Sequence, residues 1–166
     1  DLFAPQAWAS AAAAAGMKYF VVTTKHHEGF CLWDSRHTAY KAPNTPAGRD
    51  LLRPMVDAFR ERNMRVGFYH SLLDWHHPHM LIDPHIGPHR DLSAGERAKL
   101  NAHRDQTRYA QYLYNQTEEL LSDFGPIDVL WYDFSYPKPD GTGKGHQDWQ
   151  SENLLKLIRG LQPNIL

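Results

Sequence analysis

Short apolar runs alternate along the chain with longer segments of helical periodicity or composition. The short runs are rich in β-branched and aromatic residues, and they predict buried strands over 19–24, 65–69 and 127–134. The longer segments predict helices over 5–15, 50–62, 97–123 and 149–160, and residues 163–166 read as the beginning of a fourth strand. This alternation, without hairpin signals, predicts an α/β protein with a parallel sheet.

Polar and aromatic side chains follow each predicted strand directly. In a (β/α)8 barrel the loops after the strands build the active site, so three such strand ends in succession favour a barrel segment over an open sheet. The chain starts without an initiator Met and ends on what reads as a new strand. We therefore expect residues 1–166 to be a fragment of one catalytic domain, with about half of a (β/α)8, TIM-like barrel. The segment 79–95, rich in Pro and His, reads as a long loop over the site.

The predicted strand 127–134 carries a carboxylate at its carboxyl end. Side chains alternate between the two faces of a strand, so Val129, Trp131 and Asp133 should share one face and Leu130 and Tyr132 the other. This places an aromatic ring beside a carboxylate where parallel sheets hold their sites. The alternative is that Asp133 only caps the following turn.

The sequence Lys25-His26-His27-Glu28 follows the first predicted strand. Consecutive residues of a strand face opposite sides, which argues against a shared metal ion, and His77-Pro78-His79 has metal-ligand spacing only within a loop broken by Pro. We expect no metal and no cofactor. A neutral imidazole offers one donor and one acceptor, so a histidine pair suits a polyhydroxylated ligand. A single His would more simply bond to loop backbone.

Aromatic residues gather at the same strand ends: Phe30, Trp33, Tyr69, Trp75, Trp131 and Tyr132. Flat apolar rings beside polar groups suit a sugar, although core packing explains some of them, Phe30 and Trp33 most readily. Asp133 in such a pocket could act as a glycosidase nucleophile, which requires a second carboxylic acid. Asp74 and Glu28 are candidates by position, and either could instead cap a loop or give hydrogen-bond support.

The charge and amino-acid composition argue against several classes of binding partner. The formal net charge is −1, with 42% hydrophobic and 22% charged residues, and the basic residues are scattered, so nothing indicates nucleic acid or an anionic membrane surface. No apolar run approaches the roughly 20 residues that span a bilayer. The single cysteine, Cys31, excludes an internal disulfide framework and a Cys-rich zinc site. Oligomeric state leaves no signal in the sequence.

Three stretches are similar to signature segments of family 29 glycoside hydrolases, the retaining α-L-fucosidases. They are Lys18 to Ser35 (KYFVVTTKHHEGFCLWDS), Phe68 to Pro78 (FYHSLLDWHHP), and Leu120 to Asp133 around the run IDVLWYD. The similarity extends through nearly the whole chain and keeps the family's order. The chain departs from the family's pattern at Tyr132 and in the loop 79–91. These differences concern which leaving group the enzyme would prefer more than the type of reaction.

The resemblance implies a (β/α)8 catalytic domain in which Asp133 is the nucleophile and His26, His27, Tyr69 and Trp131 contact fucose. Glu28, Asp74 and Trp75 would support the site. The implied reaction removes terminal α-L-fucose from an oligosaccharide or glycoconjugate through a covalent fucosyl-enzyme. The acid/base matches no residue here and is expected beyond residue 166. Family members imply a secreted, periplasmic or lysosomal location.

Three other readings stay open at this point. One is another (β/α)8 glycosidase that acts on a related sugar such as galactose. A second is an inactive fucose-binding fragment, against which the presence of Asp133 argues, since binding alone needs no carboxylate at the anomeric carbon. A metal-dependent hydrolase comes last.

Overall fold

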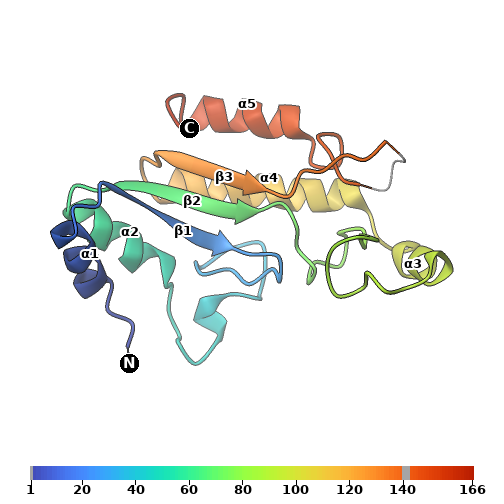
Figure 1. The fold of residues 1–166 in the computed structure, drawn as a ribbon, viewed down its shortest axis with the longest axis horizontal. Helices are drawn as coiled ribbons and strands as arrows, with labels where there is room; N and C mark the ends of the chain where they lie inside the picture. Colours follow the sequence, from blue (N-terminus) through green and yellow to red (C-terminus); the bar gives the residue numbers. More distant parts are fainter. Residues whose placement is uncertain (1, 140–142) are drawn as a thin grey trace.

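The computed structural model describes residues 2–139 and 143–166. Its centre is a parallel sheet in the order β1-β2-β3, formed by Tyr19–Lys25, Arg65–Ser71 and Val129–Asp133 (Figure 1). The ends of the three strands differ from those of the predicted runs by at most two residues. The prediction of a parallel α/β fold is therefore confirmed.

The register between β2 and β3 places their polar and aromatic residues opposite one another. Tyr69 lies opposite Trp131 and Ser71 opposite Asp133. Nearer the amino end of β2, a Cβ on Gly67 would lie 2.9 Å from a Val21 methyl carbon and 3.0 Å from the Val129 Cβ. Gly67 therefore lets the valines of β1 and β3 close over β2 on the face that also carries Tyr69 and Asp133.

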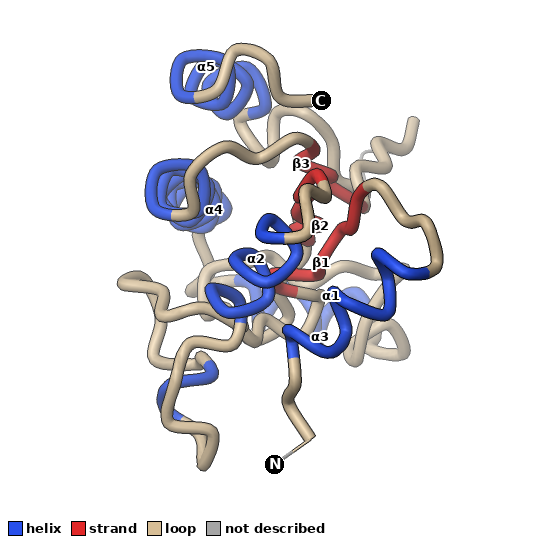
Figure 2. The backbone as a smooth tube through the Cα atoms, turned by 90° about the vertical axis from the view of Figure 1, so that its left-hand side faces the viewer, coloured by secondary structure: helices blue, strands red, loops and turns tan. Residues whose placement is uncertain are grey.

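Helices cover the other face. α2 (Leu52–Glu61) and α5 (Ser151–Leu161) match the predicted segments to within two residues, α4 (Gln106–Asp123) lies beside α5, and α1 (Pro5–Ala14) packs against α2. Figure 2 shows α4 and α5 together on one side of the sheet. A short 3₁₀ helix, η1 (Ala42–Asn44), interrupts the loop after β1. Within the described residues, no helix has the length and apolar character needed to cross a bilayer.

The single helix predicted over 97–123 is wrong. The structure has two helices there, α3 (Ala94–Asn101) and α4. Ser93 and Glu96 form a capping box at the start of α3, and the Asp105 carboxylate accepts from the backbone N–H groups of Thr107 and Arg108 to start α4. Two caps so close together require two helices. One face of α4 is buried, and its members recur at helical spacing: Tyr109, Tyr112, Leu113, Gln116 and Leu120.

Residues 163–166 do not form the expected strand. Leu166 alone follows the path of one, because its N–H donates to the Asp128 carbonyl at 3.0 Å and its carbonyl accepts from Leu130 N–H at 2.8 Å. A single residue paired with the edge of β3 is too short a ladder to count as a strand.

The two faces of the sheet differ in burial. The helix-facing side forms the core, with Val22, Phe68, Leu113 and Leu120 buried in one cluster. The opposite side is open, and its Trp131 side chain is 58% exposed. Side chains on this open side are therefore accessible to solvent.

Candidate active site

Asp133 ends β3 on the open face, and both of its carboxylate oxygens accept hydrogen bonds. The Tyr69 hydroxyl donates to Oδ2 at 2.8 Å, and the backbone N–H of Phe134 donates to Oδ1 at 2.8 Å. The chain turns directly after Asp133, where Phe134 has a φ of 70° in the left-handed region. The bond from the Phe134 N–H is one that a residue capping a turn would make. The bond from the Tyr69 hydroxyl comes from the neighbouring strand and is not of that type. Asp133 is thus more than a cap.

The predicted alternation of β3 is confirmed on both faces. Tyr132 points toward the helices, where its hydroxyl lies 2.5 Å from the Thr117 hydroxyl of α4. Trp131 lies on the open face with its ring centroid 6.0 Å from that of Tyr69. An exposed indole and a phenol therefore line the approach to Asp133, as an apolar wall that a sugar ring could stack against.

His26 and His27 lie side by side, with ring centroids 3.9 Å apart. The expectation that consecutive residues point to opposite sides is wrong here. β1 ends at Lys25 after a shift in register at Thr23, so both histidines lie in the turn beyond the strand. The His26 ring lies 5.7 Å from the Tyr69 ring, nearly parallel to it. The His27 ring meets the edge of Phe134 at 4.3 Å. The histidine pair thus borders the same site as Asp133.

Electrostatics set the protonation of these groups. Burial, followed by the hydrogen bond to Asp133, raises the pKa of Tyr69, so its hydroxyl keeps the proton that it donates. Burial, followed by the neighbouring His26, lowers the pKa of His27, with Asp133 and Glu28 opposing. His27 is therefore neutral at physiological pH. Its Nδ1 lies 2.6 Å from the hydroxyl of Ser71, a contact that sequence reasoning missed.

Asp74 and Lys25 form a buried ion pair under the site, with Lys25 Nζ 3.4 Å from Asp74 Oδ2. Asp74 Oδ1 accepts from the backbone N–H groups of His76 and His77 at 3.1 and 2.8 Å. Its carboxylate is buried and fully paired, and it joins Lys25 to the loop after β2.

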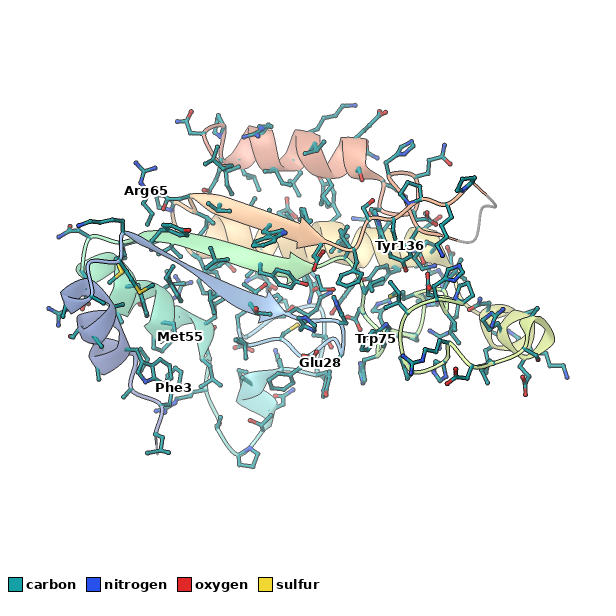
Figure 3. The ribbon with its side chains drawn as sticks, viewed as in Figure 1. Phe3, Glu28, Met55, Arg65, Trp75 and Tyr136 are labelled. Atoms are coloured by element: carbon teal, nitrogen blue, oxygen red, sulfur yellow. The ribbon has the colours of Figure 1, made fainter. Side chains whose placement is uncertain are left out.

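Glu28 and Trp75 lie beyond the carboxyl ends of the strands, whereas Arg65 marks the opposite end of β2 (Figure 3). The Glu28 carboxylate is half-exposed, 3.5 Å from His26 Nδ1. Trp75 donates its backbone N–H to the His27 carbonyl at 2.7 Å and packs its ring 5.3 Å from the His27 ring. The structure thus brings every predicted site residue to one end of the sheet.

The loop after β2 is tied down at several points. The Tyr136 hydroxyl, on the loop after β3, donates to the buried Asp83 at 2.5 Å. Arg104 donates to the carbonyls of His77 and Met80. The His77 ring lies 4.3 Å from that of Tyr112. These contacts explain how a segment so rich in Pro keeps a defined course beside the site.

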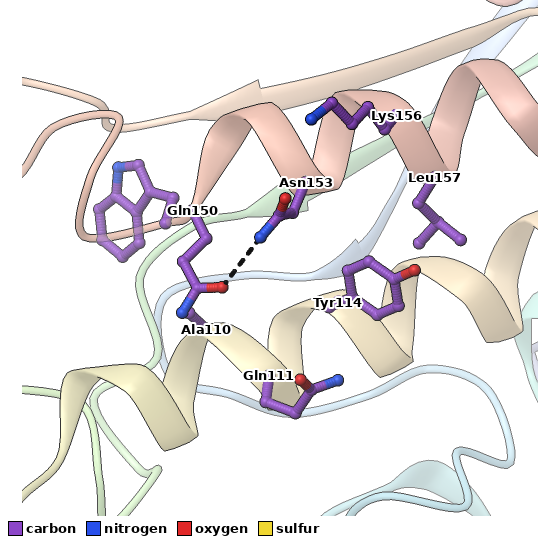
Figure 4. A pocket seen from close by; sticks show the side chains of 8 residues that line it. Ala110, Gln111, Tyr114, Gln150, Asn153, Lys156 and Leu157 are labelled. Carbon is purple, nitrogen blue, oxygen red and sulfur yellow. Dashed lines mark hydrogen bonds between the residues drawn. The ribbon is translucent and has the colours of Figure 1, made fainter.

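A groove of about 610 Å³ lies elsewhere, between α4 and α5 (Figure 4). Tyr114, Gln150, Asn153 and Lys156 are among its lining residues, and none of the predicted site residues reaches it. At the start of α5, on one side of this groove, the Asn153 side-chain amide donates to the Gln150 side-chain oxygen at 3.4 Å. Within the described residues, no three His, Cys, Asp or Glu side chains are grouped to hold a metal ion.

Known proteins resemble this chain along its whole length. The family model described as Alpha-L-fucosidase matches residues 1–166. The tissue alpha-L-fucosidase of Homo sapiens is 33% identical over 162 residues, which are 97% of this chain and 30% of that protein.

Two solved structures carry the same fold. The alpha-L-fucosidase isoenzyme 1 from Paenibacillus thiaminolyticus has 52% identity and a TM-score of 0.84, over 98% of this chain and 37% of that one. A GH29 alpha-L-fucosidase from Bacteroides thetaiotaomicron, trapped as a covalent intermediate with 2-fluoro-fucosyl fluoride, has 29% identity and a TM-score of 0.78, over 98% and 33%. The chain spans about a third of the length of these relatives. By its sequence along all 166 residues and by its fold, it belongs to the alpha-L-fucosidase family of glycoside hydrolases.

Proposed function

We propose that the natural protein containing this chain is an exo-acting α-L-fucosidase that removes terminal α-L-fucose from glycans with net retention of configuration. Residues 1–166 would supply about half of its (β/α)8 catalytic domain, in keeping with three parallel strands whose carboxyl ends carry the polar residues. The substrate would be a fucosylated oligosaccharide or glycoconjugate. The protein would act in a secreted, periplasmic or lysosomal setting.

The observation that carries the proposal is the setting of Asp133. Its two oxygens are held by the Tyr69 hydroxyl and the Phe134 N–H, so the carboxylate has a defined orientation on the open face of the sheet. In the proposed reaction a carboxylate oxygen attacks the anomeric carbon, and the bond from that carbon to the leaving oxygen breaks as an acid protonates the oxygen. Water then attacks the anomeric carbon from the face that the leaving group occupied, opposite Asp133, and gives a proton to the group that served as the acid. The Asp133 carboxylate leaves, which restores the original configuration. The relative trapped as a covalent intermediate supports this route.

The surrounding residues have complementary roles in this proposal. Trp131 and Tyr69 would contact the apolar face of fucose, and His26 and His27 would bind its hydroxyl groups. Glu28, Asp74 and Trp75 would support them. Neither Asp74, which is buried and paired, nor Glu28, which pairs with His26, is assigned as the acid/base. That residue is expected beyond residue 166.

The test is chemical rescue of the nucleophile in the natural protein. Asp133→Gly should abolish hydrolysis of p-nitrophenyl α-L-fucoside, and added azide should restore turnover with a fucosyl azide of inverted configuration as product. Asp57→Gly, at an exposed position of α2 on the helix side of the sheet, is the matched control and should retain full activity. Full activity in the Asp133 variant would show that Asp133 is not the nucleophile. A folded wild-type protein that cleaves only a related glycoside, or binds fucose without turnover, would reject the fucosidase assignment.

A further inference from the structure

The hydroxyl of Ser71, at the end of β2, has three polar neighbours. It lies 2.6 Å from His27 Nδ1, 3.0 Å from the Leu73 backbone N and 3.0 Å from the Leu73 carbonyl oxygen. Ser71 and Leu73 are completely buried. Buried polar groups need partners, so the single hydroxyl proton must be placed where it satisfies the most neighbours.

Counting protons distinguishes two arrangements. The Leu73 N–H occupies one lone pair of the Ser71 oxygen in both. If the hydroxyl donated to His27, the buried Leu73 carbonyl would lose its only hydrogen-bond donor among the described residues, at a cost of about 1–3 kcal/mol. If the hydroxyl donates to Leu73 instead, the remaining lone pair accepts a proton from His27 Nδ1, and every group is satisfied.

We propose that Ser71 is a positioning residue that holds His27 as the tautomer with its proton on Nδ1, so that Nε2 is an unprotonated acceptor for a ligand hydroxyl. The ring cannot easily turn to exchange its two nitrogens. Phe134 and Trp75 meet it edge-on and His26 lies against it. The backbone carbonyl of His27 accepts a hydrogen bond from the Trp75 N–H at 2.7 Å, which fixes the backbone of this turn.

The identity of the ligand rests on the proposed function, whereas the tautomer does not. In a fucosidase, a ring hydroxyl of fucose would donate its proton to His27 Nε2. A site built to accept such a bond strongly rejects an analogue that lacks the hydroxyl, because the buried acceptor is then left unpaired. Ser71, which never touches the sugar, would thus help to select it.

The first experiment needs no substrate. The natural protein is labelled with ¹⁵N in its histidine rings, and the His27 signals are assigned with a His27→Gln variant. The expected spectrum shows a protonated Nδ1 and an unprotonated Nε2 for His27 at neutral pH. A proton on Nε2 in the folded wild-type protein overturns the proposal, whether or not the protein cleaves fucosides.

The second experiment assigns the effect to Ser71. Ser71→Ala should release the tautomer preference in the spectrum and raise KM for an aryl fucoside about tenfold, with a smaller change in kcat. Ser71→Thr keeps the hydroxyl and should restore both. An unchanged tautomer in a folded Ser71→Ala protein overturns the role of Ser71. If Ser71→Ala does not fold, the wild-type spectrum still decides. The expected tautomer in a protein inert toward fucosides would reject the proposed function and leave this inference standing.

Discussion

The ammonium group of Lys25 lies 3.4 Å from Oδ2 of Asp74, and both side chains are closed to solvent. The pair joins the end of β1 to the loop after β2. Lys25 also lies 5.0 Å from the ring centroid of Tyr112, so its charge faces an aromatic ring as well as a carboxylate. One buried interaction therefore fixes the loop that carries Trp75 against the strand end that carries the histidine pair.

Removing one member of this pair should destabilise the protein severely. Lys25→Met leaves the Asp74 charge buried without its partner, and we expect the free energy of unfolding to fall by about 3–5 kcal/mol in urea denaturation. The double variant Lys25→Met/Asp74→Leu should recover much of this loss, because it removes both charges. Arg90→Met, whose partner Asp91 has a 91% exposed side chain, should not measurably shift the transition. A Lys25→Met protein as stable as the Arg90 variant would contradict the prediction.

Gly29 and Gly16 offer a matched test of close approach to Asp74. Both have positive φ, 86° and 81°, so alanine is strained at either position. Space differs, because a Cβ on Gly29 would lie 2.2 Å from Asp74 Oδ1 whereas one on Gly16 meets nothing within 4 Å. We expect Gly16→Ala to cost about 1 kcal/mol and Gly29→Ala roughly 3 kcal/mol or more, as measured by denaturation. Equal costs would show that Asp74 does not constrain the turn.

Tyr69 and Tyr132 test the two faces of the sheet separately. Tyr69→Phe removes the hydrogen bond to Asp133 and, if the proposed function holds, should lower kcat/KM for an aryl fucoside roughly ten- to a hundredfold. Tyr132→Phe removes the bond to Thr117 on the helix side, and should lower the free energy of unfolding by about 1 kcal/mol while activity stays unchanged. If the two variants lose activity to the same extent, the prediction that only the hydroxyl on the open face contributes to activity is wrong.

His77 should make the protein less stable in acid. Burial lowers its pKa from 6.5 to about 4, with Lys25, His79 and His76 acting in the same direction and Asp74 opposing. Between these two pH values the unfolded chain binds a proton that the folded chain does not, so the free energy of unfolding rises with pH across this window. His77→Gln should flatten that rise in denaturation curves recorded from pH 4 to 6.5. His103→Gln, at an exposed position between α3 and α4, controls for the loss of a histidine. An unchanged slope in the His77 variant would count against the assignment.

Local patterns in the sequence anticipated most of the fold. The three strands and the buried face of α4 follow from period and composition, because a core-facing element repeats its apolar residues with its own geometry. The same rule placed Trp131 and Asp133 on one face. The error over 97–123 arose because helical periodicity does not register a short break, while the caps at Ser93 and Asp105 that make the break depend on single side chains.

The sequence by itself thus determined which elements form and which residues reach the carboxyl ends of the strands. Only the tertiary structure decided how those residues pair. Asp133 accepts one of its hydrogen bonds from Tyr69, 64 positions away, and His27 lies against Ser71, 44 positions away. Such partners depend on the register between neighbouring strands and on where the turn after β1 bends. Both are set by packing across the whole sheet, which no local pattern records.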